Sequence, residues 1–140
     1  MTWNRSVICL TVLGMLAAPI SAETKWTNIG STSNGIQMFV AVESIKKKRI
    51  ASKLSYSEIW ARQNFAERTI SVKGKKVNYS SADMLFNIRC DDNKYRIETT
   101  YGLDRDSNIV FADHNVNFKK WDEIELASTI ADVKQMACIK

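Results

Sequence analysis

Apolar and polar positions alternate with a period of two over several short stretches of the chain. The clearest stretch is 84–90, in which apolar side chains and Cys90 occupy every second position. Because successive side chains of a strand point to opposite faces, this pattern predicts a strand with Cys90 on the core side. Asp91-Asp92-Asn93 is typical of a turn, and residues 95–101 alternate again. The two stretches therefore predict a β-hairpin.

Other segments have the composition of strands separated by polar turns. Asn34-Gly35 is a tight-turn signal, and the alternation fades between Gln63 and Ser81, which predicts a mobile loop or an irregular strand connection. In one segment Met38, Val40 and Val42 share a face, and in another Ile50, Leu54, Tyr56 and Trp60 do so. The predicted strands are Trp26–Ile29, Gln37–Val42, Ile50–Arg62 and Ile109–Phe111.

The pattern changes to a helical period near the end of the sequence. Ser128 can cap a helix that runs to about Cys138, and Ile130, Val133 and Ala137 fall near one side of it. Strands followed by one helix predict an α+β domain, a small antiparallel β-sheet with a C-terminal helix packed on it. The helix would carry Cys138 toward Cys90.

The first 22 residues have the pattern of a secretory signal peptide. A positive charge at Arg5 precedes an apolar run, Val7–Ile20, and Ile20-Ser21-Ala22 suits a cleavage site between Ala22 and Glu23. The alternative is a membrane anchor, but the run has about 14 residues, fewer than the ~20 that span a bilayer. We therefore predict a signal peptide over 1–22 and a single domain over 23–140 without a transmembrane anchor. The protein is expected to be exported to the periplasm or the medium, with the cell surface as the open alternative.

Removing the signal peptide changes the composition. The full chain has 140 residues, three cysteines and a net charge of +5. Without residues 1–22, one of its 20 basic residues and one cysteine are lost, which leaves 118 residues with a net charge of +4. An even number of cysteines in an exported protein favours a disulfide, here between Cys90 and Cys138. Two buried free thiols are the alternative.

The chain has few groups that could carry out catalysis. His114 is the one histidine, beside Asp113, and no spacing of cysteine, histidine and carboxylate residues is typical of a metal site. Asp91 and Asp92 are consecutive in a turn, which favours a solvated turn over an acid–base pair. We predict a non-enzymatic protein without a cofactor, and export argues against a nucleic-acid partner.

Two basic clusters fall at predicted tips or loops of the sheet. They can serve solubility and edge protection, or they can contact an anionic partner such as a glycosaminoglycan, lipid headgroups or an acidic protein. Aromatic side chains at positions 56, 60, 95 and 101 form a core, a dimer face or a partner surface. The candidate binding residues are Lys46, Lys47, Lys48, Arg49, Lys73, Lys75 and Lys76.

Five landmarks in this order resemble the surface-adhesin protein E-like family of exported Gram-negative proteins, over essentially all of 25–138. The chain opens with a Trp strand, has a strand that ends in Glu-Ser-Ile, a Cys-containing hairpin with Tyr-Arg after the Cys, a late Trp before an apolar stretch, and a final Ala-Cys. These landmarks are Trp26–Gly30, Phe39–Ile45, Phe86–Cys90 with Lys94-Tyr95-Arg96, Trp121 with Ile124, and Ala137-Cys138.

The resemblance implies a small antiparallel sheet with helical packing and a disulfide. It also implies a surface protein that binds host matrix and serum proteins and can form a homodimer. Two other classes stay open, a periplasmic enzyme inhibitor of the lysozyme type and a structural envelope protein. Because lysozyme is basic, the net charge of +4 counts against the inhibitor.

Overall fold

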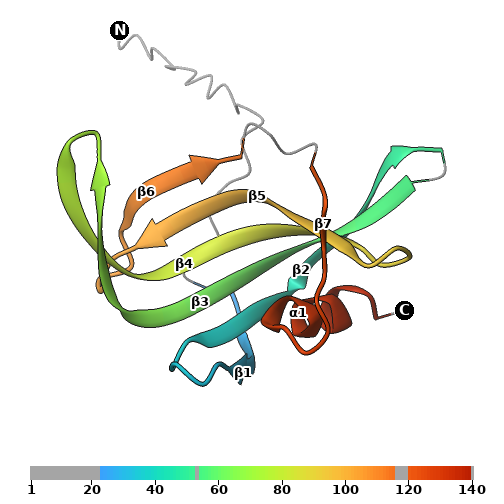
Figure 1. Cartoon of the computed structure of the whole chain (residues 1–140), viewed down its shortest axis with the longest axis horizontal. Helices are drawn as coiled ribbons and strands as arrows, with labels where there is room; N and C mark the ends of the chain where they lie inside the picture. Colours follow the sequence, from blue (N-terminus) through green and yellow to red (C-terminus); the bar gives the residue numbers. More distant parts are fainter. Residues whose placement is uncertain (1–22, 53, 116–119, 140) are drawn as a thin grey trace, which may run out of the picture.

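The structure, a computed structural model, describes residues 23–52, 54–115 and 120–139. The predicted signal peptide, with Ala22 of its cleavage site, lies outside these ranges. The described elements follow one another along the chain as a series of strands and then a helix (Figure 1). They are β1 (Thr27–Ser31), β2 (Gln37–Ala51), β3 (Leu54–Val72), β4 (Lys75–Arg89), β5 (Lys94–Leu103), β6 (Ile109–His114), β7 (Asp122–Glu123) and α1 (Thr129–Ala137).

The strands form one antiparallel sheet with the topology of a meander. Each strand from β1 to β6 pairs with the next one along the chain, and β7 pairs with the start of β5. The helix α1 lies against β1, β2 and β3 (Figure 1). The predicted antiparallel sheet with a C-terminal helix is therefore confirmed, but the molecule is mostly β, because α1 has nine residues. Within the described ranges, no helix is long and apolar enough to cross a bilayer.

The main hydrophobic core lies between α1 and one face of the sheet, which we call the helix-covered face. Central positions of three strands, Val40, Ile59 and Phe86, are fully buried there beneath Val133 of the helix. These strand residues recur with a period of two, so each strand contributes alternate side chains to the same face. The other buried members of this core are Met38, Ala61, Met84, Ile88, Ile124 and Ala137.

The helix begins and ends as the sequence predicts. The Ser128 side chain accepts a hydrogen bond from the backbone N–H of Ala131 at 3.1 Å, which confirms it as the N-cap. After the last helical residue, Cys138 forms the predicted disulfide with Cys90, with 5.8 Å between their Cα atoms. The bridge links the end of α1 to the end of β4, and it confirms that Cys90 lies on the core side.

The opposite face of the sheet, which we call the second face, carries a smaller apolar cluster. The rings of Trp60 and Tyr101 stack with centroids 6.0 Å apart, beside the buried side chains of Ala41 and Leu85. Trp26, before β1, packs against this cluster. Aromatic contacts here stabilise the sheet itself, so Trp60 and Tyr101 belong to a core.

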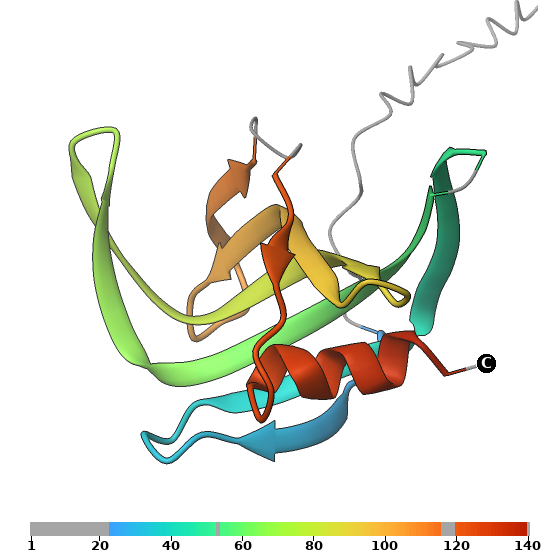
Figure 2. The ribbon, with the colours of Figure 1, turned by 45° about the vertical axis from the view of Figure 1, so that its right-hand side comes forward.

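Segment 63–81 forms strands, and the prediction of a loop there is wrong. β3 and β4 continue through it as a two-stranded ribbon that rises at one end of the sheet (Figure 2). The ribbon turns at Lys73-Gly74, where both residues have positive φ, as tight hairpin turns require. A register shift between Asn64 and Arg68 interrupts the alternation, and most of the ribbon's side chains are exposed. The period-two signal is therefore absent although the strands are present.

The predicted strand Ile50–Arg62 is also wrong in its boundaries, because a hairpin turn falls inside it. β2 ends at Ala51 and β3 begins at Leu54, so Lys46–Arg49 lies within a strand rather than at a tip. Ile50 is 47% exposed, and the side chains of β3 that reach the main core are at odd positions. The register also shifts between Ala41 and Lys46, and Val42 is 39% exposed, whereas Val40 is buried.

Candidate functional site

The first basic cluster, Lys46–Arg49, lies on the outer half of β2. The inner half of β2 pairs with both β1 and β3, but the outer half pairs only with β3 among the described strands. The four basic side chains are exposed. Lys46 and Lys48 pair with Glu58 and Tyr56, on the second face, whereas Lys47 and Arg49 pair with serines and point to the other face. Both faces of this strand edge are therefore basic.

A bulge in β2 separates this basic cluster from the core. On β2 the register advances from Ala41 to Lys46, while on β3 it moves only from Trp60 to Glu58. The hydroxyl of Ser44 fills the gap, because it donates to the Ala41 carbonyl at 2.6 Å and accepts from the backbone N–H of Trp60 at 2.9 Å. The bulge thus satisfies backbone groups while it redirects the strand.

The second basic cluster lies at the opposite end of the sheet. Lys73 is in the turn between β3 and β4, and Lys75 and Lys76 begin β4, where they pair with Val72 and Ser71. The hairpin of Lys46–Arg49 and the ribbon of this second cluster rise at different ends of the molecule (Figures 1 and 2). The structure therefore does not bring the two predicted clusters into one patch.

A cluster of arginine and aromatic side chains lies near the first basic cluster. The guanidinium of Arg96 is 4.1 Å from the ring centroid of Trp121 and 5.4 Å from that of Tyr56. The guanidinium of Arg89, at the end of β4, lies 5.3 Å from the centroid of the same Trp121 ring. Cations at these distances are attracted to the ring faces. Tyr56 pairs directly with Lys48, so the arginine–aromatic cluster adjoins the first basic cluster.

Buried polar groups hold Arg96 in place. Its side chain is 7% exposed, and its Nε donates to the Asn87 side-chain oxygen at 3.1 Å. The Asn87 amide in turn donates to Glu98 at 3.2 Å. Burial lowers the pKa of Arg96, and a hydrogen bond with Tyr56 works in the opposite direction. These contacts make Arg96 a fixed part of the second face.

Glu58 is the acidic residue closest in register to the first basic cluster. Burial raises the pKa of Glu58, Lys48 and Lys46 oppose that rise, and Glu98 adds to it. Its carboxylate therefore offsets part of the positive charge on the second face. On the other face, Lys47 and Arg49 pair with serines of β3.

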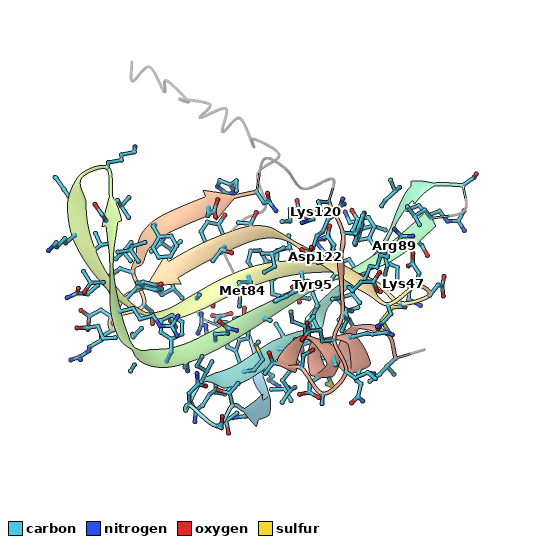
Figure 3. The ribbon with its side chains drawn as sticks, viewed as in Figure 1. Lys47, Met84, Arg89, Tyr95, Lys120 and Asp122 are labelled. Carbon is cyan, nitrogen blue, oxygen red and sulfur yellow. A yellow bond between two sulfur atoms is a disulfide. The ribbon has the colours of Figure 1, made fainter. Side chains whose placement is uncertain are left out.

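A shallow pocket of about 170 Å³ lies beside the disulfide. Lys47 and the disulfide border it (Figure 3). Ser57 and Ala137 also line it. Its size is below that of typical small-molecule sites, which hold roughly 300–1,000 Å³. The pocket lies against the α1-facing side of the first basic cluster.

His114 and Asp92, which the sequence offered as candidate polar groups, both have structural contacts. His114 ends β6, with its Nδ1 3.3 Å from the Thr99 hydroxyl and its ring against Tyr101. Asp92 lies in the turn after β4, as predicted, and pairs with Arg89. Over the described ranges, no three His, Cys, Asp or Glu side chains are placed to hold a metal ion.

The sequence did not single out Arg89, Arg96 and Trp121 as a group. Alternation places Arg89 opposite the core residues of β4, and Trp121 stands in a charged setting. Their proximity, however, depends on the register between β4 and β5, where Asn87 pairs with Arg96. A period-two pattern gives the face of a strand but not its register.

No protein-family model, curated protein or solved structure matches this chain. The resemblance to the surface-adhesin protein E-like family therefore stays a prediction.

Proposed function

We propose that this chain is an exported, non-enzymatic binding protein that holds an anionic macromolecule through the outer half of β2. The observation that carries the proposal is the position of Lys46–Arg49. Four consecutive basic side chains stand exposed on an edge that pairs with no described strand on its outer side. Such a concentration of positive charge attracts acidic surfaces and speeds their association.

Two further features support this function. The largely buried guanidinium groups of Arg89 and Arg96, packed against Trp121, add positive charge on the strands β4 and β5 near the basic edge. The Cys90–Cys138 disulfide is typical of exported proteins, which work where thiols are oxidised. The resemblance to the surface-adhesin protein E-like family points to host matrix or serum proteins as the partners.

Charge reversal tests the proposal. We expect the variant Lys46→Glu/Lys47→Glu/Lys48→Glu to lose most of its binding to immobilised matrix and serum proteins, because repulsion replaces attraction. The matched control, Lys73→Glu/Lys75→Glu/Lys76→Glu, has the same net charge but changes the other end of the sheet. Binding by the unmodified protein should also weaken as salt shortens the Debye length from about 30 Å at 0.01 M to about 3 Å at 1 M. Equal binding by both variants and the unmodified protein would contradict the proposal.

A further inference from the structure

The outer edge of β2 has backbone groups available for another strand. β1 pairs with β2 only as far as Val40, and no described strand pairs with that edge from Val42 to Ala51. An edge strand directs the N–H and C=O groups of alternate residues outward. In Figures 1 and 2 this part of the β2–β3 hairpin projects beyond α1 and the rest of the sheet. An extended chain can therefore approach it without displacing any of the described strands or the helix.

The side chains along this edge select which chain can pair with it. A second copy of the same edge would place lysines opposite lysines, and like charges directly opposite each other destabilise a strand pair. A strand with acidic side chains would instead place unlike charges opposite each other. The basic edge thus disfavours self-association and favours an acidic partner strand.

The distribution of the charges makes the selection more specific. Lys46 and Lys48 point to the second face, and Lys47 and Arg49 point to the helix-covered face. A matching strand needs acidic residues on both of its faces, which means a run of consecutive acidic residues rather than an alternating pattern. Ile50 directly follows the run, and Val42 precedes it beyond the bulge that holds Glu43, Ser44 and Ile45; both apolar side chains are partly exposed. They offer contacts for apolar residues on either side of the acidic run.

We infer that the edge of β2 between Val42 and Ala51 binds an extended polypeptide segment as an added strand, and that the segment carries about four consecutive Asp or Glu residues flanked by apolar ones. This inference rests on the proposed function and names the chemistry of its partner. Backbone hydrogen bonds supply the pairing, and the charges supply the selection.

The experiment uses the purified protein and peptides of about ten residues in which four consecutive glutamates are flanked by valines. Two further peptides have the same charges but carry N-methyl groups on alternate residues, one on the odd and the other on the even positions. Peptide affinity is measured by fluorescence anisotropy at about 0.15 M ionic strength. Because an added strand uses the N–H groups of one edge only, we expect one methylated peptide to bind like the parent and the other to lose affinity by about tenfold or more.

Protein variants locate the binding edge. Lys47→Glu/Arg49→Glu should lose the parent peptide, whereas the control Lys73→Glu/Lys75→Glu should keep it. Residues 47 and 49 have serines opposite them, so these changes create no like-charge pair within the hairpin. Circular dichroism checks that both variants stay folded. Hydrogen exchange should slow at outward-facing amides of β2 when the parent peptide binds.

The outcomes separate this inference from the proposed function. Equal affinity for both methylated peptides, with loss in Lys47→Glu/Arg49→Glu, would overturn strand addition but support binding of anionic partners. Binding of a sulfated polysaccharide without binding of the parent peptide would do the same. A failure of every anionic probe would overturn both.

Discussion

The two faces of the sheet bury their side chains in different ways. The helix-covered face holds an apolar core closed by α1 and linked to it by a disulfide. The second face combines a small apolar cluster with buried polar groups, among them Asp83, Asn87 and Arg96. Each of these polar side chains has a partner, as burial requires. The comparison indicates that the helix-covered face is held by apolar packing, whereas the second face combines apolar contacts with buried, paired polar groups.

Substitutions at two adjacent residues, Phe86 and Leu85, should have the largest effects on stability. They test the comparison because the two side chains point to opposite faces. Phe86 is 1% exposed in the main core, and Leu85 is 3% exposed in the smaller cluster. We expect Phe86→Ala to lower the free energy of unfolding by about 4 kcal/mol and Leu85→Ala by about 2.5 kcal/mol. Urea denaturation measures both. A larger loss for Leu85→Ala would reverse our assignment of the main core.

The ion pair of the second face gives an intermediate effect. Arg62 donates to both carboxylate oxygens of Asp83, at 2.6 and 2.8 Å, and its guanidinium lies 4.5 Å from the Trp26 ring. Since Asp83 is buried, Asp83→Asn leaves the arginine without its charge partner, and we expect a loss of about 2 kcal/mol.

An exposed ion pair is the matched control for that loss. Arg105 and Glu67 lie 3.0 Å apart with the arginine largely in solvent. Arg105→Gln should change the free energy of unfolding by no more than about 0.5 kcal/mol. Thermal or urea unfolding measures both substitutions. If Asp83→Asn and Arg105→Gln lower the free energy of unfolding equally, burial does not strengthen the Arg62–Asp83 ion pair.

The smallest effect concerns the pH dependence of stability. Burial raises the pKa of Glu58 above its usual value of 4.5, so the folded state favours the protonated carboxyl. This contribution to stability is present below the unfolded pKa and is lost as the pH rises through the folded pKa. Glu58→Gln removes it. We expect the variant to gain stability relative to the unmodified protein between about pH 4 and about pH 7, as followed by urea unfolding. A relative loss of the variant over that range would mean that Lys46 and Lys48 dominate.

The sequence predicted the regions in which alternation is unbroken. The strand that ends at Cys90, the following turn, the Ser128 cap and the Cys90–Cys138 disulfide are confirmed. The strand, the turn and the cap depend on the local sequence pattern, and the disulfide depends on there being two cysteines in 23–140. They need no knowledge of strand register.

The errors fall at register shifts and in projecting hairpins. Shifts after Ala41 and after Asn64 change which side chains face the core, and sequence alternation alone does not show them. The ribbon around Lys73 has no buried face, so its strands lack a hydrophobic period. For the site, the two basic clusters are visible in the sequence as candidates, but their separation and the arginine–aromatic cluster depend on the fold and on strand register.

The meander has a consequence for the order in which the protein assembles. Each neighbour in the sheet is also the next strand along the chain, so the strands can pair one hairpin at a time over short loops. The helix follows all of them, and its Cys138 reaches back 48 residues to Cys90. We therefore expect the sheet to form before its apolar face is covered. During that interval Phe86 and its neighbours are exposed, and oxidation of the two thiols marks the end of folding.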